Sequence, residues 1–198
     1  MFALMMTVEG MAAARRRALS DQECEALLAG IGRGEGQAFD AFYRATDKML
    51  YAYALSLTRS HQDAQDIMME TYLKIRAAAH LYKPQGKPLA WVFTIARNLA
   101  RSRQRAAGRE ALFADIDQAE LAFDPGDRTD EALVLRAALR CLSEEERQIV
   151  VLHAVSGMKH RELAALLDLP LSTVLSKYTR ALGKLRSYLT TQEVGTHG

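Results

Sequence analysis

Apolar residues recur every three or four positions along most of this 198-residue chain, which is the pattern of amphipathic α-helices. In the first half, the pattern predicts four helices, over residues 20–29, 37–59, 60–79 and 88–105. In the second half, it predicts one helix ending near residue 142 and three more, over residues 143–156, 159–167 and 172–189. We therefore expect an all-α fold whose last two helices, joined by a short turn, form a helix-turn-helix.

Serines and glycines mark the expected helix ends. Four serines are expected to cap helix N-termini, two of them in a capping box with a glutamate three residues further on: Ser20 with Glu23, Ser60, Ser143 with Glu146, and Ser172. The glycines at 30, 32, 34 and 36 are expected to end the first helix, Gly108 the fourth, and Gly157 the helix that precedes the helix-turn-helix.

Composition divides the chain into two domains. Residues 107–130 are rich in acidic side chains and have too few evenly spaced apolar residues to build a core. We therefore expect a first helical domain at 18–106, a flexible acidic linker at 107–130 and a second helical domain at 131–190. Residues 1–17 are interpreted as a loose tail or a mis-called start, and residues 191–198 as a second tail.

The overall composition is that of a soluble globular protein, with 49% hydrophobic and 25% charged residues. A net charge of +2 says little about partners. No apolar run approaches the roughly 20 residues that cross a membrane, so membrane insertion is not expected. The two cysteines, Cys24 and Cys141, lack a CxxC spacing and are interpreted as small buried hydrophobes in reduced form.

Catalytic and metal-binding motifs are not found. The sequence contains no GxxxxGK[ST], GxGxxG, HExxH or GxSxG. His153 and His160 lie seven residues apart, but Gly157 lies between them and no acidic or thiol companion is in register, so a zinc site is not expected. The chain is expected to have no cofactor and not to be an enzyme.

The helix at 88–105 carries two different faces. Its apolar stripe is Leu89, Val92, Ile95, Ala96 and Leu99. Its polar face is Trp91, Thr94, Asn98, Arg101 and Arg105. An aromatic ring, an amide and a row of guanidinium groups suit a single-stranded nucleic acid, because bases stack on the ring and arginines neutralise phosphates. The plainer alternative is a half-buried tryptophan beside solvated arginines.

Three carboxylates, Asp63, Asp66 and Glu70, share one face of the helix at 60–79. A paired-carboxylate enzyme would present something similar, but no histidine or lysine lies at matching spacing for acid–base chemistry. Two readings stay open: a solvated acidic face, or a docking surface for a basic partner.

The last predicted helix, at 172–189, also divides into two faces. Its inward face is expected to be Val174, Tyr178, Ala181, Leu182 and Leu185. Its outward face is expected to be Thr173, Ser176, Lys177, Arg180 and Lys184. Basic and hydroxyl side chains near the start of a capped helix are typical of a recognition helix in the DNA major groove. An exposed amphipathic helix is the alternative.

Together these segments resemble a known family. The runs DAFYRATDKMLYAYALSLTRSHQDAQDIMMETYLKI and LAWVFTIARNLARSRQR resemble the second conserved region of bacterial RNA polymerase sigma factors, especially the extracytoplasmic-function (ECF) group of the sigma-70 family. The run LSEEERQIVVLHAVSGMKHRELAALLDLPLSTVLSKYTRALGKLR resembles their fourth region.

The resemblance implies a role for each segment. The acidic face of the 60–79 helix would pack on the clamp of core RNA polymerase, and residues 83–105 would hold the melted non-template strand of the minus-ten element. Arg97, Asn98 and the nearby arginines match the family's ARN pattern. The fourth region would bind the minus-thirty-five element, and the acidic linker is either an inert tether or threads the polymerase.

Some positions depart from the family pattern. Asp168 replaces a glycine that is usual in the turn, and Leu175 and Lys177 stand where a lysine and an arginine are typical. These changes add a negative charge near DNA and remove a phosphate contact, so upstream affinity below the family norm is expected.

The sequence thus predicts a cytoplasmic alternative sigma factor that guides core polymerase to promoter DNA and assists strand opening in transcription initiation. An anti-sigma protein is left open as a partner. One alternative is a free-standing helix-turn-helix regulator, in which the acidic face of the 60–79 helix and the Trp91–Asn98 face would have no function. Another alternative is a helical adaptor whose basic face binds acidic proteins. Such an adaptor would not bind nucleic acid with a steep salt dependence.

Overall fold

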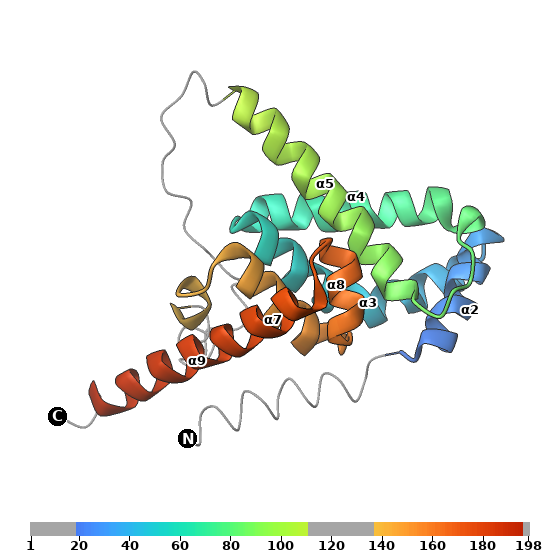
Figure 1. Cartoon of the computed structure of the whole chain (residues 1–198). Coiled ribbons are helices and arrows are strands. Elements are labelled where there is room, and N and C mark those ends of the chain that lie inside the picture. The colour runs from blue at the N-terminus through green and yellow to red at the C-terminus, as the bar shows by residue number, and fades with distance from the viewer. Residues whose placement is uncertain (1–18, 111–136, 196–198) are drawn as a thin grey trace. The chain divides into compact units, whose positions relative to one another are not determined.

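The computed structural model describes residues 19–110 and 137–195, and within these ranges the chain is helical with no strand (Figure 1). The all-α prediction is confirmed. The described residues fall into two compact units, 19–110 and 137–195, and each is described by itself. The expected tail at 1–17 and the linker residues 111–130 lie outside the described residues, so the predicted boundaries there stay predictions.

The first unit contains four α-helices and one short 3-10 helix. In chain order they are α2 (Asp21–Gly32), α3 (Gly36–Thr58), α4 (His61–Ala78), η1 (Ala79–Leu81) and α5 (Pro88–Glu110). Each of these four α-helices packs against the other three, and the most extensive contact joins α3 and α4. The largest fully buried side chains come from all four α-helices: Leu28, Phe42, Leu50, Tyr53, Ile67, Ile75, Val92 and Phe93.

The capping residues of this unit act as the sequence predicted. The Ser20 hydroxyl and the Glu23 carboxylate form a complete capping box at the start of α2. The Ser60 hydroxyl accepts a hydrogen bond from the Asp63 amide at the start of α4. Each cap satisfies an amide that the helix itself leaves without a partner, so these helix starts are determined locally.

Two of the glycine predictions are wrong, because Gly30 and Gly32 lie inside α2 rather than after it. Their role is close packing. A Cβ at Gly30 would lie 2.7 Å from the Cβ of Ala38, and one at Gly32 would lie 3.1 Å from the backbone of His80. Gly108 also fails to end its helix, since α5 continues to Glu110. A single glycine costs a helix only about 1 kcal/mol, which neighbouring residues offset.

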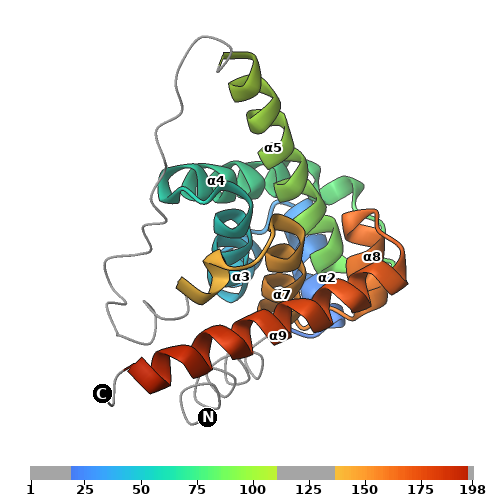
Figure 2. The same cartoon turned by 60° about the vertical axis from the view of Figure 1, so that its left-hand side comes forward.

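The second unit begins with a helical stretch at 137–140, followed by α7 (Glu144–Ser156), α8 (His160–Leu167) and α9 (Leu171–Gly195), as Figure 2 shows. Helix α9 packs against both α7 and α8, and α8 and α9 form the predicted helix-turn-helix. Ser143 and Glu146 complete the predicted capping box, and Gly157 ends α7 in a left-handed conformation. Leu142, Val150 and Ala181 form a shared buried cluster.

Three details of α9 differ from the prediction. The helix begins at Leu171, so Ser172 lies within its first turn instead of capping it. It continues to Gly195, five residues into the expected tail at 191–198, because residues 190–194 contain no glycine or proline. Leu182 was expected to face inward, but its side chain is 45% exposed.

Candidate polymerase and nucleic-acid interfaces

The three carboxylates on α4 lie on the outside of the first unit, as the acidic-face prediction requires. Asp63 and Asp66 are exposed and Glu70 is half-exposed. Arg103 on α5 bridges two of them: its guanidinium lies 3.1 Å from an Asp66 oxygen and 3.3 Å from a Glu70 oxygen. Burial lowers the pKa of Arg103, but the bonds to Asp66 and Glu70 outweigh it and raise the pKa.

Arg103 was not predicted as part of this site, because it lies on another helix, 37 residues from Asp66 and 33 from Glu70 in the sequence. Two apolar side chains beside the acids were missed as well. Met69 is 53% exposed and Leu73 65% exposed. Together with Asp66 and Glu70 they occupy positions three and four residues apart, so all four share one face of α4. The surface is therefore acidic and apolar at once.

The polar face predicted on α5 lies outside the core. Thr94, Asn98, Arg101 and Arg105 are exposed, while Trp91 and Arg97 are half-buried. On the opposite face Leu89, Val92, Ala96 and Leu99 are buried as predicted, and Ile95 is only half-buried. Phe93, omitted from the predicted stripe, is fully buried with its ring 5.1 Å from that of Tyr53. The structure thus brings the six predicted strand-binding residues to one accessible region of α5.

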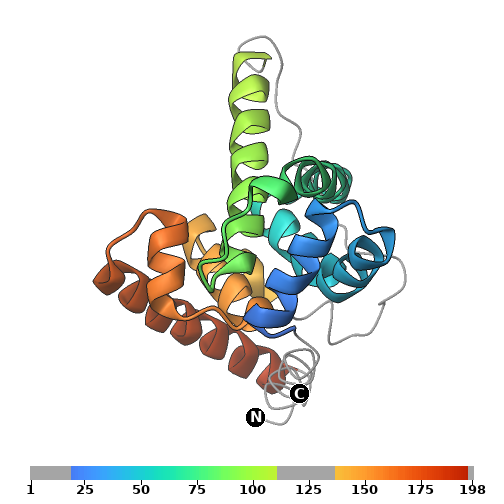
Figure 3. The ribbon, with the colours of Figure 1, turned by 90° about the vertical axis from the view of Figure 1, so that its right-hand side faces the viewer.

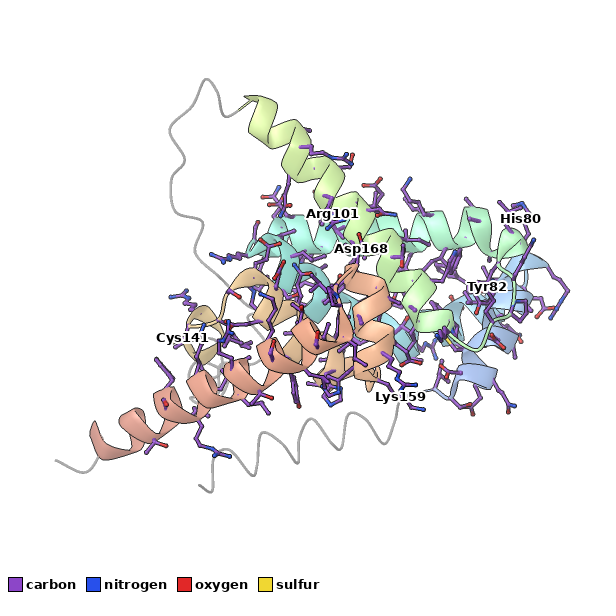
Figure 4. All side chains as sticks on the ribbon, in the orientation of Figure 1. His80, Tyr82, Arg101, Cys141, Lys159 and Asp168 are labelled. Carbon is purple, nitrogen blue, oxygen red and sulfur yellow. The ribbon has the colours of Figure 1, made fainter. Side chains whose placement is uncertain are left out.

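The loop from η1 into α5 is held by a residue that the sequence did not single out. One carboxylate oxygen of Glu25, on α2, accepts hydrogen bonds from the Tyr82 hydroxyl (3.1 Å) and from the amides of Gln85 (3.0 Å) and Gly86 (2.8 Å). The Tyr82 ring lies 5.2 Å from the Trp91 ring. Burial, and then the bond to Glu25, raises the pKa of Tyr82 to about 12. Figure 4 labels Tyr82 beside this loop and Arg101 further along α5.

The outward residues of α9 have different environments. Ser176 and Arg180 are exposed, and Thr173 is half-buried with its carbonyl accepting from the Ser176 hydroxyl at 3.0 Å. Leu175, which stands where the family favours lysine, is 44% exposed. Thr179, absent from the prediction, is exposed on the same side.

The two lysines predicted for DNA contact are engaged by α7. The ammonium of Lys177 lies 2.7 Å from a Glu145 oxygen, and that of Lys184 lies 2.7 Å from an oxygen of the buried Glu146. Burial alone would raise the pKa of Glu146, but hydrogen bonds from Lys184 and Ser143 outweigh it and lower the pKa. Lys184 therefore stabilises the α7–α9 contact, and both lysines lie at the edge of the outward face.

The histidine pair comes together in space. The rings of His153 and His160 stack with centroids 4.8 Å apart, and both contact Tyr178 of α9. Nδ1 of His153 lies 2.8 Å from the Met158 carbonyl oxygen. Burial, and then His153, lowers the pKa of His160. Within the described ranges, no group of three or more His, Cys, Asp or Glu could hold a metal ion.

The cysteine prediction is half right. Cys24 is buried, and burial raises the pKa of its thiol to about 12. Cys141 is exposed, because it follows the helical stretch at 137–140 in a turn at the surface. Among the described helices, none combines the length and hydrophobicity that a membrane crossing needs.

Comparison with known proteins identifies the two units. Residues 42–110 match the model of "Sigma-70 region 2", and residues 132–185 match "Sigma-70, region 4". The chain is 35% identical over 142 residues to the ECF RNA polymerase sigma factor EcfG of Rhodopseudomonas palustris, which covers 71% of this chain and 78% of that protein. The chain belongs to the ECF sigma factors. The sigma factor SigK of Mycobacterium ulcerans is 31% identical over 175 residues, covering 84% of this chain and 94% of that one.

Two solved structures are similar to this chain in fold. The sigma factor RpoE of Bartonella quintana, solved in complex with the anti-sigma factor NepR, has a TM-score of 0.66 and 28% identity, covering 76% of this chain and 97% of that one. CnrH, solved with the cytosolic domain of CnrY, has a TM-score of 0.62 and 25% identity, covering 85% and 98%. This sigma factor is therefore a non-enzymatic initiation factor that directs RNA polymerase to specific promoters.

Proposed function

We propose that this sigma factor divides promoter recognition among three surfaces. The acidic and apolar face of α4 docks on core polymerase through Asp63, Asp66 and Glu70. The exposed face of α5 holds the melted minus-ten strand through Trp91, Arg97, Asn98, Arg101 and Arg105. The start of α9 binds the minus-thirty-five duplex, with Ser176 and Arg180 at its centre and Thr173, Lys177 and Lys184 at its edge.

The observation that carries this proposal is the α5 face. A half-buried tryptophan lies seven positions before an exposed asparagine, with exposed arginines beyond it. A closed duplex offers little to such a face, since its bases are already stacked on one another. A separated strand offers both a base to stack and free base edges to bind. The face therefore fits an opened promoter.

A free-standing regulator does not fit this family assignment. Such a protein would need α9 but would have no use for the acidic face of α4 or for Trp91. Both matched regions support the proposed domain division, because they fall within the predicted domains 18–106 and 131–190, apart from four residues at the end of α5. The site of action is then the cytoplasm, where RNA polymerase transcribes.

An anti-sigma protein is proposed as a further partner. The relative from Bartonella quintana was solved with one, and exposed apolar side chains on α4 offer this chain a surface of the right character. Such a partner would compete with core polymerase for that face.

Charge reversal tests the docking part directly. The double variant Asp66→Lys/Glu70→Lys should lose co-purification with core polymerase and promoter-specific transcription in vitro. Its circular dichroism and binding of minus-thirty-five duplex should be retained, because exposed substitutions rarely change stability by more than about 0.5 kcal/mol. Undiminished co-purification would overturn the docking role of α4.

A further inference from the structure

The loop at 82–87 is hydrogen-bonded to Glu25 of α2 at two places, at its first residue and at residues 85 and 86. The single Glu25 oxygen accepts from the hydroxyl at residue 82 and from two successive backbone amides at 85 and 86. Successive amides that point at one anion form a concave anion-binding turn, and Gly86 supplies its left-handed residue with φ +66°. In this sigma factor, the anion is a side chain of the protein itself.

Helix α2 is a firm support for this contact. Cys24 and Leu28, on either side of Glu25, are fully buried in the core. Further along, Gly32 allows α2 to approach the backbone of His80, directly before the loop. Figure 3 shows α2, in blue, lying beside the start of α5, in green, and the two helices are in contact. The loop is therefore tied to a rigid element at two separate points.

The contacts of Glu25 extend, through Tyr82, to the strand-binding face of α5. Tyr82 donates to Glu25 and also places its ring against that of Trp91. Two exposed lysines belong to the same loop. Lys83 lies between the Tyr82 and Gly86 contacts, and Lys87 lies between Gly86 and the start of α5. Releasing Glu25 would free the loop amides and one side of the tryptophan together.

We propose that Glu25 is a positioning residue for strand capture: it holds the loop and Trp91 ready for the melted strand without touching DNA. This rests on the proposed function of the α5 face and adds the residue that orders it. An ordered loop loses little conformational freedom on binding, whereas a free loop must be ordered by the strand itself. Glu25 would therefore increase both the affinity for the opened strand and the selectivity among its bases.

The test uses the full chain in holoenzyme with core polymerase. Glu25→Ala should bind a single-stranded minus-ten oligonucleotide roughly tenfold more weakly, about the cost of ordering the backbone of one residue. It should also discriminate less between the preferred minus-ten sequence and single-base variants. Glu25→Gln, which keeps the accepting oxygen, should recover most of both properties. Asp40→Ala, which removes an exposed carboxylate from α3, is the charge-matched control and should behave like the wild type.

Hydrogen exchange separates a failed inference from a failed fold. In Glu25→Ala the amides of Gln85 and Gly86 should exchange faster while those of α3 stay protected. Faster exchange with unchanged oligonucleotide binding and base selectivity would overturn the positioning role. Asn98→Ala serves as the reference for the proposed function. If that variant is impaired and Glu25→Ala is not, only the inference about Glu25 fails; if neither is impaired, the strand-binding role of α5 fails as well.

Discussion

Asp168 ends α8 in a left-handed backbone conformation, with φ 58° and ψ 47°, and its side chain is exposed. This conformation costs an L-residue roughly 1–2 kcal/mol, and glycine adopts it freely. Asp168→Gly should therefore stabilise the second unit by about 0.5–1 kcal/mol, once the greater freedom of glycine in the unfolded chain is deducted. Urea unfolding followed by circular dichroism measures the change.

Asp168→Asn is the matched control, because it removes the charge and keeps the Cβ. If Asp168→Gly raises the free energy of unfolding and Asp168→Asn does not, the backbone conformation is the cause. Equal gains in both variants would attribute the effect to the charge and contradict the prediction.

Arg180 and Lys177 were predicted to serve the same purpose, but the structure gives them different surroundings. Arg180 is exposed, whereas Lys177 is half-buried and paired with Glu145. Arg180→Ala should lower the slope of log affinity against log salt by about one, the amount for one phosphate contact. Lys177→Ala should lower it less, since Glu145 already neutralises that charge.

The measurement is binding of a minus-thirty-five duplex over a range of salt concentrations. Arg140→Ala removes an equally exposed positive charge from the helical stretch before α7, and its slope should not change. A changed preference for sequence in Arg180→Ala, with the slope intact, would mean that this side chain reads bases rather than phosphates.

At the scale of helices, α5 and α4 are joined by the Arg103 bridge to Asp66 and Glu70. All three side chains are more than a third exposed, so the bridge contributes only about 0.2–1 kcal/mol to stability. Arg103→Ala should leave the unfolding curve almost unchanged. It should tighten binding of core polymerase by roughly two- to fivefold, because a basic partner no longer has to displace the guanidinium.

Fluorescence anisotropy with labelled sigma factor and core polymerase gives the affinity. Arg44→Ala, which removes an exposed arginine from α3, is the control for lost positive charge. Weaker binding in Arg103→Ala alone would show that this arginine belongs to the docking surface itself.

Where α7, α8 and α9 meet, the ring of His160 packs against those of His153 and Tyr178, and this environment favours its neutral form. Its pKa is lowered in the folded protein by burial and by His153, so the unfolded chain binds more protons once pH falls below the ordinary value of 6.5. The stability that neutral His160 allows is complete above pH 6.5 and declines as pH falls below it. Glu146, whose folded pKa is also lowered, loses its contribution in a more acidic range, below its ordinary 4.5.

Intrinsic amide exchange is base-catalysed and slows as pH falls, so exchange of the α8 and α9 amides should slow less between pH 7.5 and 5.5 than intrinsic chemistry predicts, which leaves an excess of exchange at the lower pH. His160→Gln removes the titrating group and should flatten this excess. An equal excess in His160→Gln would assign the pH dependence to another group.

These helices were largely predictable because their signals are local. The serine caps at 20, 60 and 143 and the apolar stripes each lie within a few residues of what they determine. The contacts between helices were not predictable in this way. Glu25 meets Gly86 across 61 residues, and Arg103 meets Asp66 across 37. Gly30 and Gly32 were misread for the same reason: a glycine that ends a helix and one that admits a neighbouring helix are identical in the sequence.

At the scale of the whole molecule, the proposed surfaces for recruitment and for opening are separate. Docking uses α4, upstream binding uses α9, and strand capture uses the outer face of α5. Each interface can then be impaired without the others. Substituting α5 should consequently affect a late step, after the closed complex has formed.

Asn98→Ala is the sharpest test of this separation. Asn98 is exposed, so the variant should fold and form closed complexes normally. Loss of its contact to a base should reduce strand opening by roughly five- to tenfold, the equivalent of about one hydrogen bond. Permanganate reactivity of minus-ten thymines reports opening, and heparin-sensitive promoter binding reports the closed complex.

A pre-melted bubble template decides what a defect means. Separating the strands beforehand removes the unstacking cost that the α5 face would otherwise offset, to which stacking on Trp91 contributes roughly 1–3 kcal/mol. Transcription by Asn98→Ala should therefore recover on the bubble, while the Asp66→Lys/Glu70→Lys variant should stay inactive there, because it fails at recruitment. If Asn98→Ala stayed equally defective on the bubble, α5 would act before or outside strand opening, and the division of work between the surfaces would be wrong.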